Sequence, residues 1–308
     1  MTKNMAASVR QRLLNQAKQE KRPFNELLQY FAMERFLYRL GHSAYSKQFV
    51  LKGGLMFALW DEPLRRPTRD IDLLGRLNNS VEHVVSVIGT ICALPVPDDG
   101  IIFDTEKISG KQIIEGANYQ GVHVSLPAYL GKARIPIRID VGFGDKLVPG
   151  PDLMHLPSLL DLPQPELLGY SRESAIAEKF QAIVYLEEIN SRMKDFYDIW
   201  LLATNFEFNG LTLSEAIEQT FRRRNTALEL NPVAFDESFT QNPQKQTQWA
   251  RFVARNKFEG APATLAEAIE VIAAFLQPLL QALLDGRRFD QLWVLGGPWS
   301  QGKSMPNQ

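Results

Sequence analysis

Two kinds of residue pattern predict an α/β fold for this chain. Stretches in which apolar and polar residues alternate, as in strands, lie at 121–126 and 133–144. Stretches in which apolar residues recur every three or four positions, as in helices, lie at 9–41, 171–204 and 263–284. Strand patterns are therefore concentrated in the middle of the chain, between helical patterns on both sides.

The composition is that of an ordinary globular protein without strong net charge. The 308 residues are 45% hydrophobic and 22% charged, which is enough chain for two or three packed units. The net charge of −1 excludes a global attraction to nucleic acid, so an RNA partner would need a local basic patch. The single cysteine, Cys92, excludes a disulfide framework and argues against a cysteine-based metal site.

The sequence also bears on localisation. Its first residues lack the apolar segment of a signal peptide. The apolar stretch 271–284 is shorter than a membrane span and is interrupted by Gln277, Pro278 and Gln281. We therefore expect a cytoplasmic protein that does not bind a membrane.

Residues 1–45 are expected to form two helices. The first, at 9–21, is amphipathic and basic, and the second, at 25–41, has Asn25 as its predicted N-cap and Gly41 as its predicted C-cap. We favour packing helices, although the basic residues of the first helix could instead contact RNA. Those basic residues are Arg10, Arg12, Lys18 and Lys21.

The stretch 49–75 carries the most informative residues. A short apolar run leads into Lys52, Gly53 and Gly54, and a helix-like piece and a charged turn follow before a strand with Asp70 and Asp72. Carboxylates two residues apart on a strand face the same way, and they repel unless a cation lies between them. Such oxygen ligands suit Mg²⁺, and a Gly-Gly turn lets backbone N–H groups approach a phosphate.

A third carboxylate is predicted on the strand at 133–144, after a predicted helix at 80–92. Alternation puts Ile137, Ile139 and Val141 on one face, with Arg138 and Asp140 on the other. On a strand next to Asp70 and Asp72, Asp140 could complete a two-magnesium site. The alternative is that Asp140 pairs with Arg138 or another basic residue at a sheet edge.

A lysine stands out in the helical pattern at 171–204. Lys179 lies in the middle of the apolar stripe, where a lysine is rarely found unless it is paired. The alternative is a lysine whose stem packs while its ammonium group reaches water. A charged lysine there could bind a triphosphate as a point charge.

The block from Arg192 to Asp198 follows Lys179 in the same or the next helix. Asp195 and Asp198 are one helical turn apart and can face one region. Asp198 could equally form a local ion pair with Lys194, and Asp195 could pair with Arg192. The role of Asp198 stays open.

The order of these motifs resembles the nucleotidyltransferase superfamily, and more closely the AbiEii/AbiGii toxin family, which includes the MenT toxins. The matching motifs are Lys52-Gly53-Gly54, the run from Arg66 to Leu73, the strand residue Asp140, Lys179 and the 192–198 block. A Gly-Gly and an Asp-x-Asp alone are a weak signature. These motifs together, in the right order and over roughly the first two thirds of the chain, are fairly specific.

The resemblance implies an architecture with the active site in a cleft between lobes. We expect a polymerase-β-like nucleotidyltransferase core with N-terminal helices and a mostly helical C-terminal lobe. The expected parts are N-terminal helices at 1–48, the core at 49–150, a proline-rich connection at 151–170 and the helical lobe at 171–308.

The resemblance also assigns roles to residues. We expect catalytic roles for Asp70, Asp72, Lys179 and Asp195, with Asp195 orienting Lys179 or contacting the nucleotide or the acceptor. Asp70, Asp72 and Asp140 are the expected metal ligands. The expected nucleotide-binding residues are Lys52, Gly53, Gly54, Arg69 and Lys179.

The function implied by the resemblance is that of a Mg²⁺-dependent toxin, with Mn²⁺ as an alternative ion. It would transfer a nucleoside monophosphate from an NTP to the 3′ end of tRNA, block translation and stop growth. An AbiEi-like antitoxin encoded alongside is the expected partner. Two alternatives remain, namely nucleotidylation of a protein target and a non-catalytic nucleotide-binding module.

Several features of the C-terminal part are interpreted as structural or left open. Residues 297–304 match the letters of a P-loop, but too few residues follow to form the required helix. Pro278 should kink or break the helix at 263–284. The cluster Arg222–Arg224 could bind a phosphate backbone or cap a helix. The histidines, interpreted as structural or surface residues, are His42, His83, His123 and His155.

Overall fold

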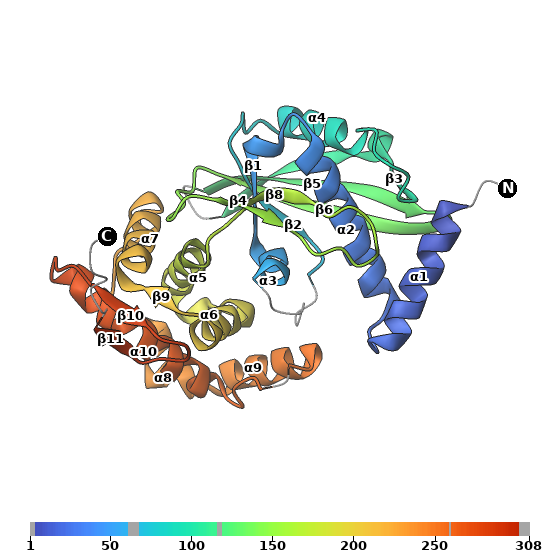
Figure 1. Cartoon of the computed structure of the whole chain (residues 1–308). Coiled ribbons are helices and arrows are strands. Elements are labelled where there is room, and N and C mark those ends of the chain that lie inside the picture. The colour runs from blue at the N-terminus through green and yellow to red at the C-terminus, as the bar shows by residue number, and fades with distance from the viewer. Residues whose placement is uncertain (1–3, 61–67, 116–118, 259, 302–308) are drawn as a thin grey trace, which may run out of the picture. The chain divides into compact units, whose positions relative to one another are not determined.

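The computed structural model describes residues 4–60, 68–115, 119–258 and 260–301. The chain forms two compact units, which are described separately (Figure 1). Unit 1 comprises Met1–Asp145 and Pro151–Tyr170, and unit 2 comprises Lys146–Gly150 and Ser171–Gln308. Most of the predicted charged turn, at 61–67, lies outside the described residues.

Unit 1 is built on a mixed sheet. Its described strands are β1 (Phe49–Lys52), β2 (Ile71–Gly75), β3 (Ile101–Phe103), β4 (Ser109–Glu115), β5 (Tyr119–Leu130), β6 (Ala133–Phe143), β7 (Asp152–His155) and β8 (Glu166–Gly169). They are ordered β3-β5-β6-β2-β1-β8-β7, and β4 also pairs with β5. The pairs β2–β6 and β1–β8 are parallel and the others are antiparallel, so the predicted α/β class is confirmed.

Helices cover one face of this sheet. They are α2 (Phe24–His42) and α4 (Val81–Cys92), and Figure 1 shows α4 along the sheet. The Phe36 ring of α2 packs edge-on against Phe103 of β3 at a centroid distance of 6.2 Å. A Cβ atom on Gly110 of β4 would lie 2.5 Å from a methyl group of Val85 in α4. Side chains that alternate with these positions therefore point to the other face.

The helix α1 (Met5–Gln19) packs on α2, as the sequence predicts for N-terminal packing helices. Both predicted caps of the second helix are wrong, because Asn25 and Gly41 lie inside α2. Gly41 has a different role. A Cβ atom at this position would lie 2.2 Å from the carbonyl oxygen of Glu166, so the glycine allows the helix to approach β8 closely.

The proline-rich segment at 151–170 contributes two strands to unit 1. Strand β7 pairs with β8, and β8 pairs with β1. The prolines at 151, 157, 163 and 165 all lie just outside these strands, so they remove no donor from the ladder. Glu34 of α2 anchors the segment by accepting hydrogen bonds from the Ser158 hydroxyl and the Leu159 N–H group, at 2.7 and 2.8 Å.

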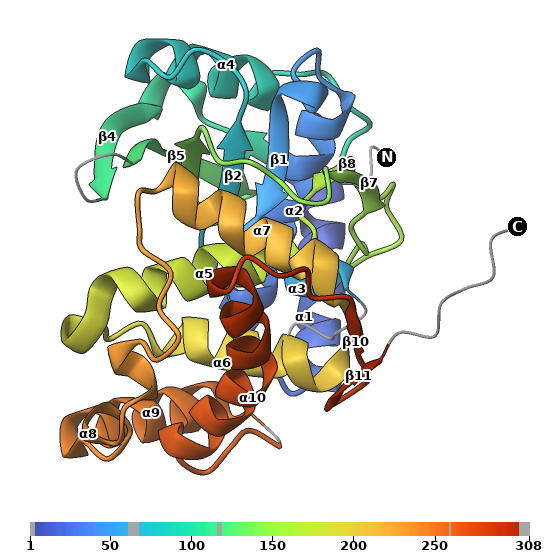
Figure 2. The ribbon, with the colours of Figure 1, turned by 90° about the vertical axis from the view of Figure 1, so that its left-hand side faces the viewer.

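Unit 2 is mostly helical. Its described helices are α5 (Arg172–Leu186), α6 (Met193–Asn205), α7 (Gly210–Arg223), α8 (Glu237–Thr240), α9 (Pro243–Asn256) and α10 (Leu265–Leu284). Helix α5 packs on α6 and α7, and α10 packs on α6 (Figure 2). The rings of Phe180 and Phe221 join α5 to α7 at a centroid distance of 5.4 Å.

The break predicted as one outcome at Pro278 does not occur, because α10 continues through this residue. Proline removes one backbone donor, but buried side chains on both sides of it, including Phe275 and Leu279, hold the helix in the core of unit 2. By length and composition alone, this helix could span a membrane. Its packing shows the alternative, a core helix whose apolar face is covered by protein.

The C-terminal hairpin packs on the helices of unit 2. Strands β10 (Gln291–Trp293) and β11 (Trp299–Gln301) pair with each other, and β10 pairs with β9 (Phe208–Asn209). The Trp293 indole donates to the carbonyl of Ala203 at 2.7 Å, and the Trp299 indole donates to that of Phe275 at 2.8 Å. The letters of the P-loop therefore begin in a β-hairpin, and residues 302–304 lie outside the described part of the chain.

Candidate active site

The Gly-Gly turn lies directly beside a predicted catalytic aspartate. Strand β1 ends at Lys52, and Gly53 follows with a φ of +71°. A Cβ atom at Gly53 would lie 2.0 Å from Oδ2 of Asp72, so any other residue would collide with this carboxylate. The glycine is therefore required both by its backbone conformation and by the close approach to Asp72.

Strand register brings the predicted residues into one row. Lys52 of β1 is the partner of Asp72 on β2, and Asp72 is the partner of Asp140 on the parallel strand β6. Asp140 is in turn the partner of His123 on β5. Paired residues on neighbouring strands point to the same face, about 5 Å apart. The row therefore places two carboxylates side by side, between a lysine and a histidine.

Asp140 and Asp70 each have a neighbouring histidine or arginine. Nδ1 of His123 lies 2.6 Å from Oδ1 of Asp140. Asp70 immediately precedes β2, and its Oδ1 lies 3.7 Å from the Arg138 guanidinium. The predicted alternative for Asp140, a basic partner, is therefore present, but that partner is His123.

Lys52 is held in place at the end of β1. Its Nζ lies 3.3 Å from Oδ2 of Asp145, and the two side chains are only 12% and 6% exposed. The ammonium group also lies 5.6 Å from the centre of the Tyr170 ring. Arg69, the other predicted nucleotide-binding cation of this stretch, is exposed at the start of β2.

The aspartates fit the way in which magnesium is usually bound. Oδ1 of Asp70 is buried and accepts no hydrogen bond, and the Asp72 carboxylate lies directly beside the backbone of Gly53. No group of three or more Asp, Glu, His or Cys side chains in the described ranges is arranged to hold a metal alone. One or two carboxylates completed by phosphate oxygens are the usual magnesium ligands, and these residues can supply the protein part.

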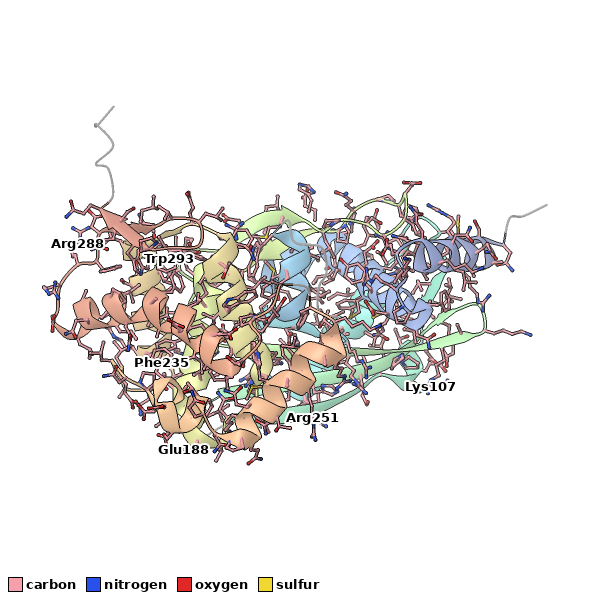
Figure 3. The ribbon with its side chains drawn as sticks, turned by 90° about the horizontal axis from the view of Figure 1, so that it is seen from below. Lys107, Glu188, Phe235, Arg251, Arg288 and Trp293 are labelled. Atoms are coloured by element: carbon pink, nitrogen blue, oxygen red, sulfur yellow. The ribbon has the colours of Figure 1, made fainter. Side chains whose placement is uncertain are left out.

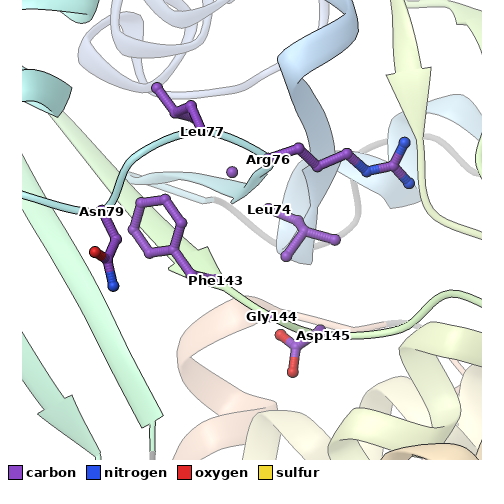
Figure 4. Close-up of a pocket in the computed structure, with 8 residues that line it drawn as sticks. Leu74, Arg76, Leu77, Asn79, Phe143, Gly144 and Asp145 are labelled. Atoms are coloured by element: carbon purple, nitrogen blue, oxygen red, sulfur yellow. The ribbon is translucent and has the colours of Figure 1, made fainter.

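A pocket lies at the carboxyl ends of β2 and β6. Its volume is about 320 Å³, Leu77 is among the residues that line it, and Figure 4 shows the Phe143 ring beside Asn79. Asp145, which contacts Lys52, also contributes to the lining. The pocket is therefore connected to the row of charged residues through one buried ion pair.

In unit 2, Lys179 and two aspartates form a buried ion cluster. Nζ of Lys179 on α5 lies 3.1 Å from Oδ1 of Asp195 and 2.8 Å from Oδ2 of Asp198, both on α6. The lysine side chain is 13% exposed, and the aspartate side chains are 3% and 2% exposed. Nε of Arg192 lies 2.9 Å from Oδ2 of Asp195. Burial is compatible with these charges because each carboxylate has a cation.

The turn between α5 and α6 is fixed by a second buried lysine. Nζ of Lys245 donates to the carbonyl oxygens of Glu188 and Asn190 at 2.7 and 2.6 Å, and it lies 4.9 Å from the Phe239 ring centre. Burial lowers the pKa of Lys245 below its ordinary value. Because the turn connects the two helices of the ion cluster, Lys245 helps to set where Asp195 lies relative to Lys179.

Comparison with known families assigns this chain. The family model described as nucleotidyl transferase AbiEii toxin, type IV toxin–antitoxin system, matches residues 35–285. The match covers most of the chain and includes the Gly-Gly turn, the aspartates and the Lys179 cluster. The protein belongs to the AbiEii family. The expected resemblance is thus confirmed, and the family is one of nucleotidyl transferase toxins that act with an antitoxin.

Two solved structures from Helicobacter pylori align with this AbiEii protein. JHP933 aligns over 85% of this chain and 95% of its own, at 15% identity and a TM-score of 0.45. A second protein, provisionally described as a nucleotidyltransferase, aligns over 85% and 98%, at 16% identity and a TM-score of 0.44. No curated protein matches the sequence significantly. The family assignment therefore rests on the family model.

Sequence reasoning missed two contacts of this AbiEii protein. The sequence predicts a structural or surface role for His123, but this residue contacts Asp140 in the row of charged residues. The sequence leaves the role of Asp198 open, and in the structure its carboxylate contacts Lys179. The alternation along β5 places His123 on the polar face, but its pairing with Asp140 depends on strand register. Strand register does not follow from the local pattern alone.

Proposed function

We propose that this AbiEii protein is a Mg²⁺-dependent nucleotidyltransferase that transfers a nucleoside monophosphate from an NTP to the 3′ end of tRNA. The observation that best supports this activity is the alignment of Asp72 and Asp140 on neighbouring parallel strands, with Asp72 directly beside the backbone of Gly53. Carboxylates next to a glycine turn suit a metal-bound triphosphate.

The chain's own residues would position the reactants. Gly53 and Gly54 would approach the phosphates, and Lys52 and Arg69 would contribute positive charge to nucleotide binding. Magnesium, held by Asp70, Asp72 and Asp140 with phosphate oxygens, would neutralise the phosphates and favour ionisation of the acceptor hydroxyl. Mn²⁺ could replace it.

The reaction is a substitution at the α-phosphorus. The oxygen of the acceptor hydroxyl forms a bond to the α-phosphorus, and the bond from that phosphorus to the bridging oxygen of the pyrophosphate breaks. The hydroxyl proton passes to water, and pyrophosphate leaves. Catalysis then consists of positioning and electrostatic stabilisation, as in other phosphoryl transfers.

Lys179 would stabilise charge on the triphosphate. Its contacts with Asp195 and Asp198 hold the ammonium group in one position in unit 2. We assign Asp195 the role of orienting Lys179, since the distance between their charged groups is 3.1 Å.

The biological role follows from modification of the acceptor. A tRNA whose 3′ end carries extra nucleotides cannot be aminoacylated, so translation and growth would stop in the cytoplasm. We expect an AbiEi-like antitoxin, encoded alongside, to counteract this activity.

A label-transfer assay tests the proposal. The purified protein is incubated with Mg²⁺ and each α-labelled NTP, with total RNA and, separately, with lysate protein. Asp72→Asn and Lys179→Ala are assayed beside the wild type, and Arg288→Ala, at an exposed residue of unit 2, is the control. Label on tRNA-sized RNA that disappears in the two site variants, but not in the control, supports the proposal.

Other outcomes identify the alternatives. Label on protein but not on RNA would show nucleotidylation of a protein target. Tight NTP binding without transfer to either acceptor would indicate a non-catalytic nucleotide-binding module. In that case, Asp72→Asn should leave any growth phenotype unchanged.

A further inference from the structure

The open face of the unit 1 sheet extends beyond the aspartates, along β5 and β6. Arg134 and Arg138 share the face of Asp140, because they alternate with buried residues of β6. Their partners on β5 are Tyr129 and Ser125. Arg134 is six residues from Asp140, a distance of about 20 Å along a strand. Two arginines on one face of β6 therefore lead along the sheet to the carboxylates, with Pro136 between them.

Exposed cations lie on this surface. Lys111 of β4 is the partner of His123, so it joins the same face at the end of the row that contains Asp140. Lys111 and Arg134 are exposed, and neither forms an ion pair with another described residue. The Arg138 side chain is 51% exposed, although its guanidinium lies 3.7 Å from Asp70. At least two positive charges are thus available to a ligand.

Aromatic, apolar and hydroxyl groups lie between and beside these cations. Tyr129 is half-buried, and its β3 partner Ile102 is 70% exposed. The hydroxyls of Ser109 and Ser125 lie 3.0 Å apart on the exposed surface. Lys107, which Figure 3 labels, lies in the turn that connects β3 to β4. Binding sites for single-stranded nucleic acid typically combine cations along the path of the nucleic-acid backbone with an aromatic ring on which a base stacks.

The densest basic cluster of the sequence is less available. Arg222 lies 2.7 Å from Glu218, and Arg224 lies 3.2 Å from Glu178. Arg224 also donates to the side-chain oxygen of Gln181 at 2.9 Å. Much of the charge of this cluster is therefore compensated within unit 2. The local basic patch that an RNA partner requires is better supplied by the strands of unit 1.

We propose that Lys111, Tyr129, Arg134 and Arg138, here called the strand track, bind the single-stranded 3′ end of an RNA acceptor. The inference rests on the proposed function, because it gives that acceptor a path to the reacting groups. Backbone phosphates are attracted by the cations and repelled by the aspartates at the end of the track. The neutral terminal hydroxyl is then the part of the RNA that can approach Asp140.

RNA binding without catalysis tests this inference directly. A 5′-labelled single-stranded oligoribonucleotide is titrated with the full chain in EDTA, without NTP, and followed by fluorescence anisotropy. The test variant is Lys111→Glu with Arg134→Glu. The matched control is Arg251→Glu with Arg288→Glu, which changes the net charge equally at exposed positions of unit 2 (Figure 3). Thermal unfolding and NTP binding of each variant check that the fold is retained.

We expect the strand-track variant to bind at least tenfold more weakly and the control to bind within about twofold of wild type. Each phosphate contact to a single strand contributes about 0.7 to the slope of log K against log salt, so the slope should fall by about 1.4. A milder pair, Lys111→Gln with Arg134→Gln, should lower the slope equally. Tyr129→Ala should weaken binding about fivefold or more without changing the slope.

The remaining outcomes overturn the inference in distinguishable ways. Equal losses in the two double variants would show an effect of net charge alone. Unchanged binding in the strand-track variants would show that RNA binds elsewhere, while transfer of label to RNA by the wild type would still support the proposed function. If the wild-type protein binds and labels a protein acceptor but neither binds nor labels RNA, both proposals are contradicted. No variant is then needed.

Discussion

The two units hold their functional carboxylates in opposite ways. In unit 1, Asp72 and Asp140 lie side by side on strands, partly exposed, with a basic residue on each side of the row. In unit 2, Asp195 and Asp198 lie on a helix, almost fully buried, and share the ammonium group of Lys179. The first arrangement favours a further cation, whereas the second already contains its own.

Because of this difference, substitutions in the two units should affect transfer activity and folding stability differently. A carboxylate that faces another carboxylate contributes little to folding, because neutralising it relieves repulsion. A buried lysine between two carboxylates is different, because removing it leaves negative charge buried without compensation. Substitutions in unit 1 should therefore affect transfer more than stability, and substitutions in unit 2 should affect both.

The largest expected effect is on transfer by Asp72→Asn. Loss of this charge should reduce the rate of nucleotidyl transfer at least about a thousandfold, because the metal-bound triphosphate loses a ligand. The free energy of unfolding should change by less than about 1 kcal/mol, since the side chain is not fully buried. Label transfer and urea unfolding measure the two quantities. A loss of several kcal/mol in stability would make the comparison of the two units wrong.

The next largest effect is on the stability of Lys179→Met. Removing the ammonium group from between Asp195 and Asp198 should lower the free energy of unfolding by about 3–5 kcal/mol. Chemical unfolding followed by circular dichroism measures this loss. Adding Asp198→Asn should recover part of it, and the double-mutant cycle gives the coupling between the two side chains.

Lys194→Met is the matched control for this experiment. Lys194 is exposed on α6, four residues before Asp198, and the sequence allows a local ion pair between them. Because Asp198 contacts Lys179, the control should change stability by less than about 0.5 kcal/mol. A large loss in this variant would restore the local pair as the main partner of Asp198.

What could be predicted from the sequence depended on local periodicity. Alternation along 133–144 correctly separated the buried face, with Ile137 and Ile139, from the polar face with Arg138 and Asp140. The apolar stripe around Lys179 correctly indicated that this lysine needs a partner. In both cases the information lies within a few residues of the position concerned.

What could not be predicted depended on contacts between distant segments. His123 and Asp140 are brought together by strand register, and Gly41 is required by a carbonyl group of β8 that is far away in sequence. The strands β7 and β8 are four residues each and are bordered by prolines, so their pattern is too short to recognise.

A smaller effect is expected from Gly53→Ala, which tests whether activity needs the close approach of the Gly53 backbone to the Asp72 carboxylate. The positive φ costs an alanine about 1–2 kcal/mol, and its Cβ would also displace the Asp72 carboxylate, so transfer should fall together with stability. Gly89→Ala in α4 is the control, because a Cβ there meets open space and should leave stability unchanged or raise it by up to about 1 kcal/mol. If Gly53→Ala keeps full transfer, close approach to Asp72 is not needed for activity.

The smallest expected effect is on the pH dependence of stability. It comes from Glu34, a buried carboxylate of unit 1 beside Arg35. Burial raises the pKa of Glu34 above its ordinary value of 4.5, against the opposing effect of Arg35. At a pH between the ordinary pKa of Glu34 and its raised pKa in the folded state, the folded state binds more protons than the unfolded state. The free energy of unfolding should therefore fall as the pH rises through this window. The slope for one proton is at most about 1.4 kcal/mol per pH unit, and it should disappear in Glu34→Gln, which cannot titrate. Urea unfolding of both proteins from pH 4 to pH 7 measures the difference, and equal slopes would show that Arg35 compensates Glu34 as fully as Lys179 and Arg192 compensate the aspartates of unit 2.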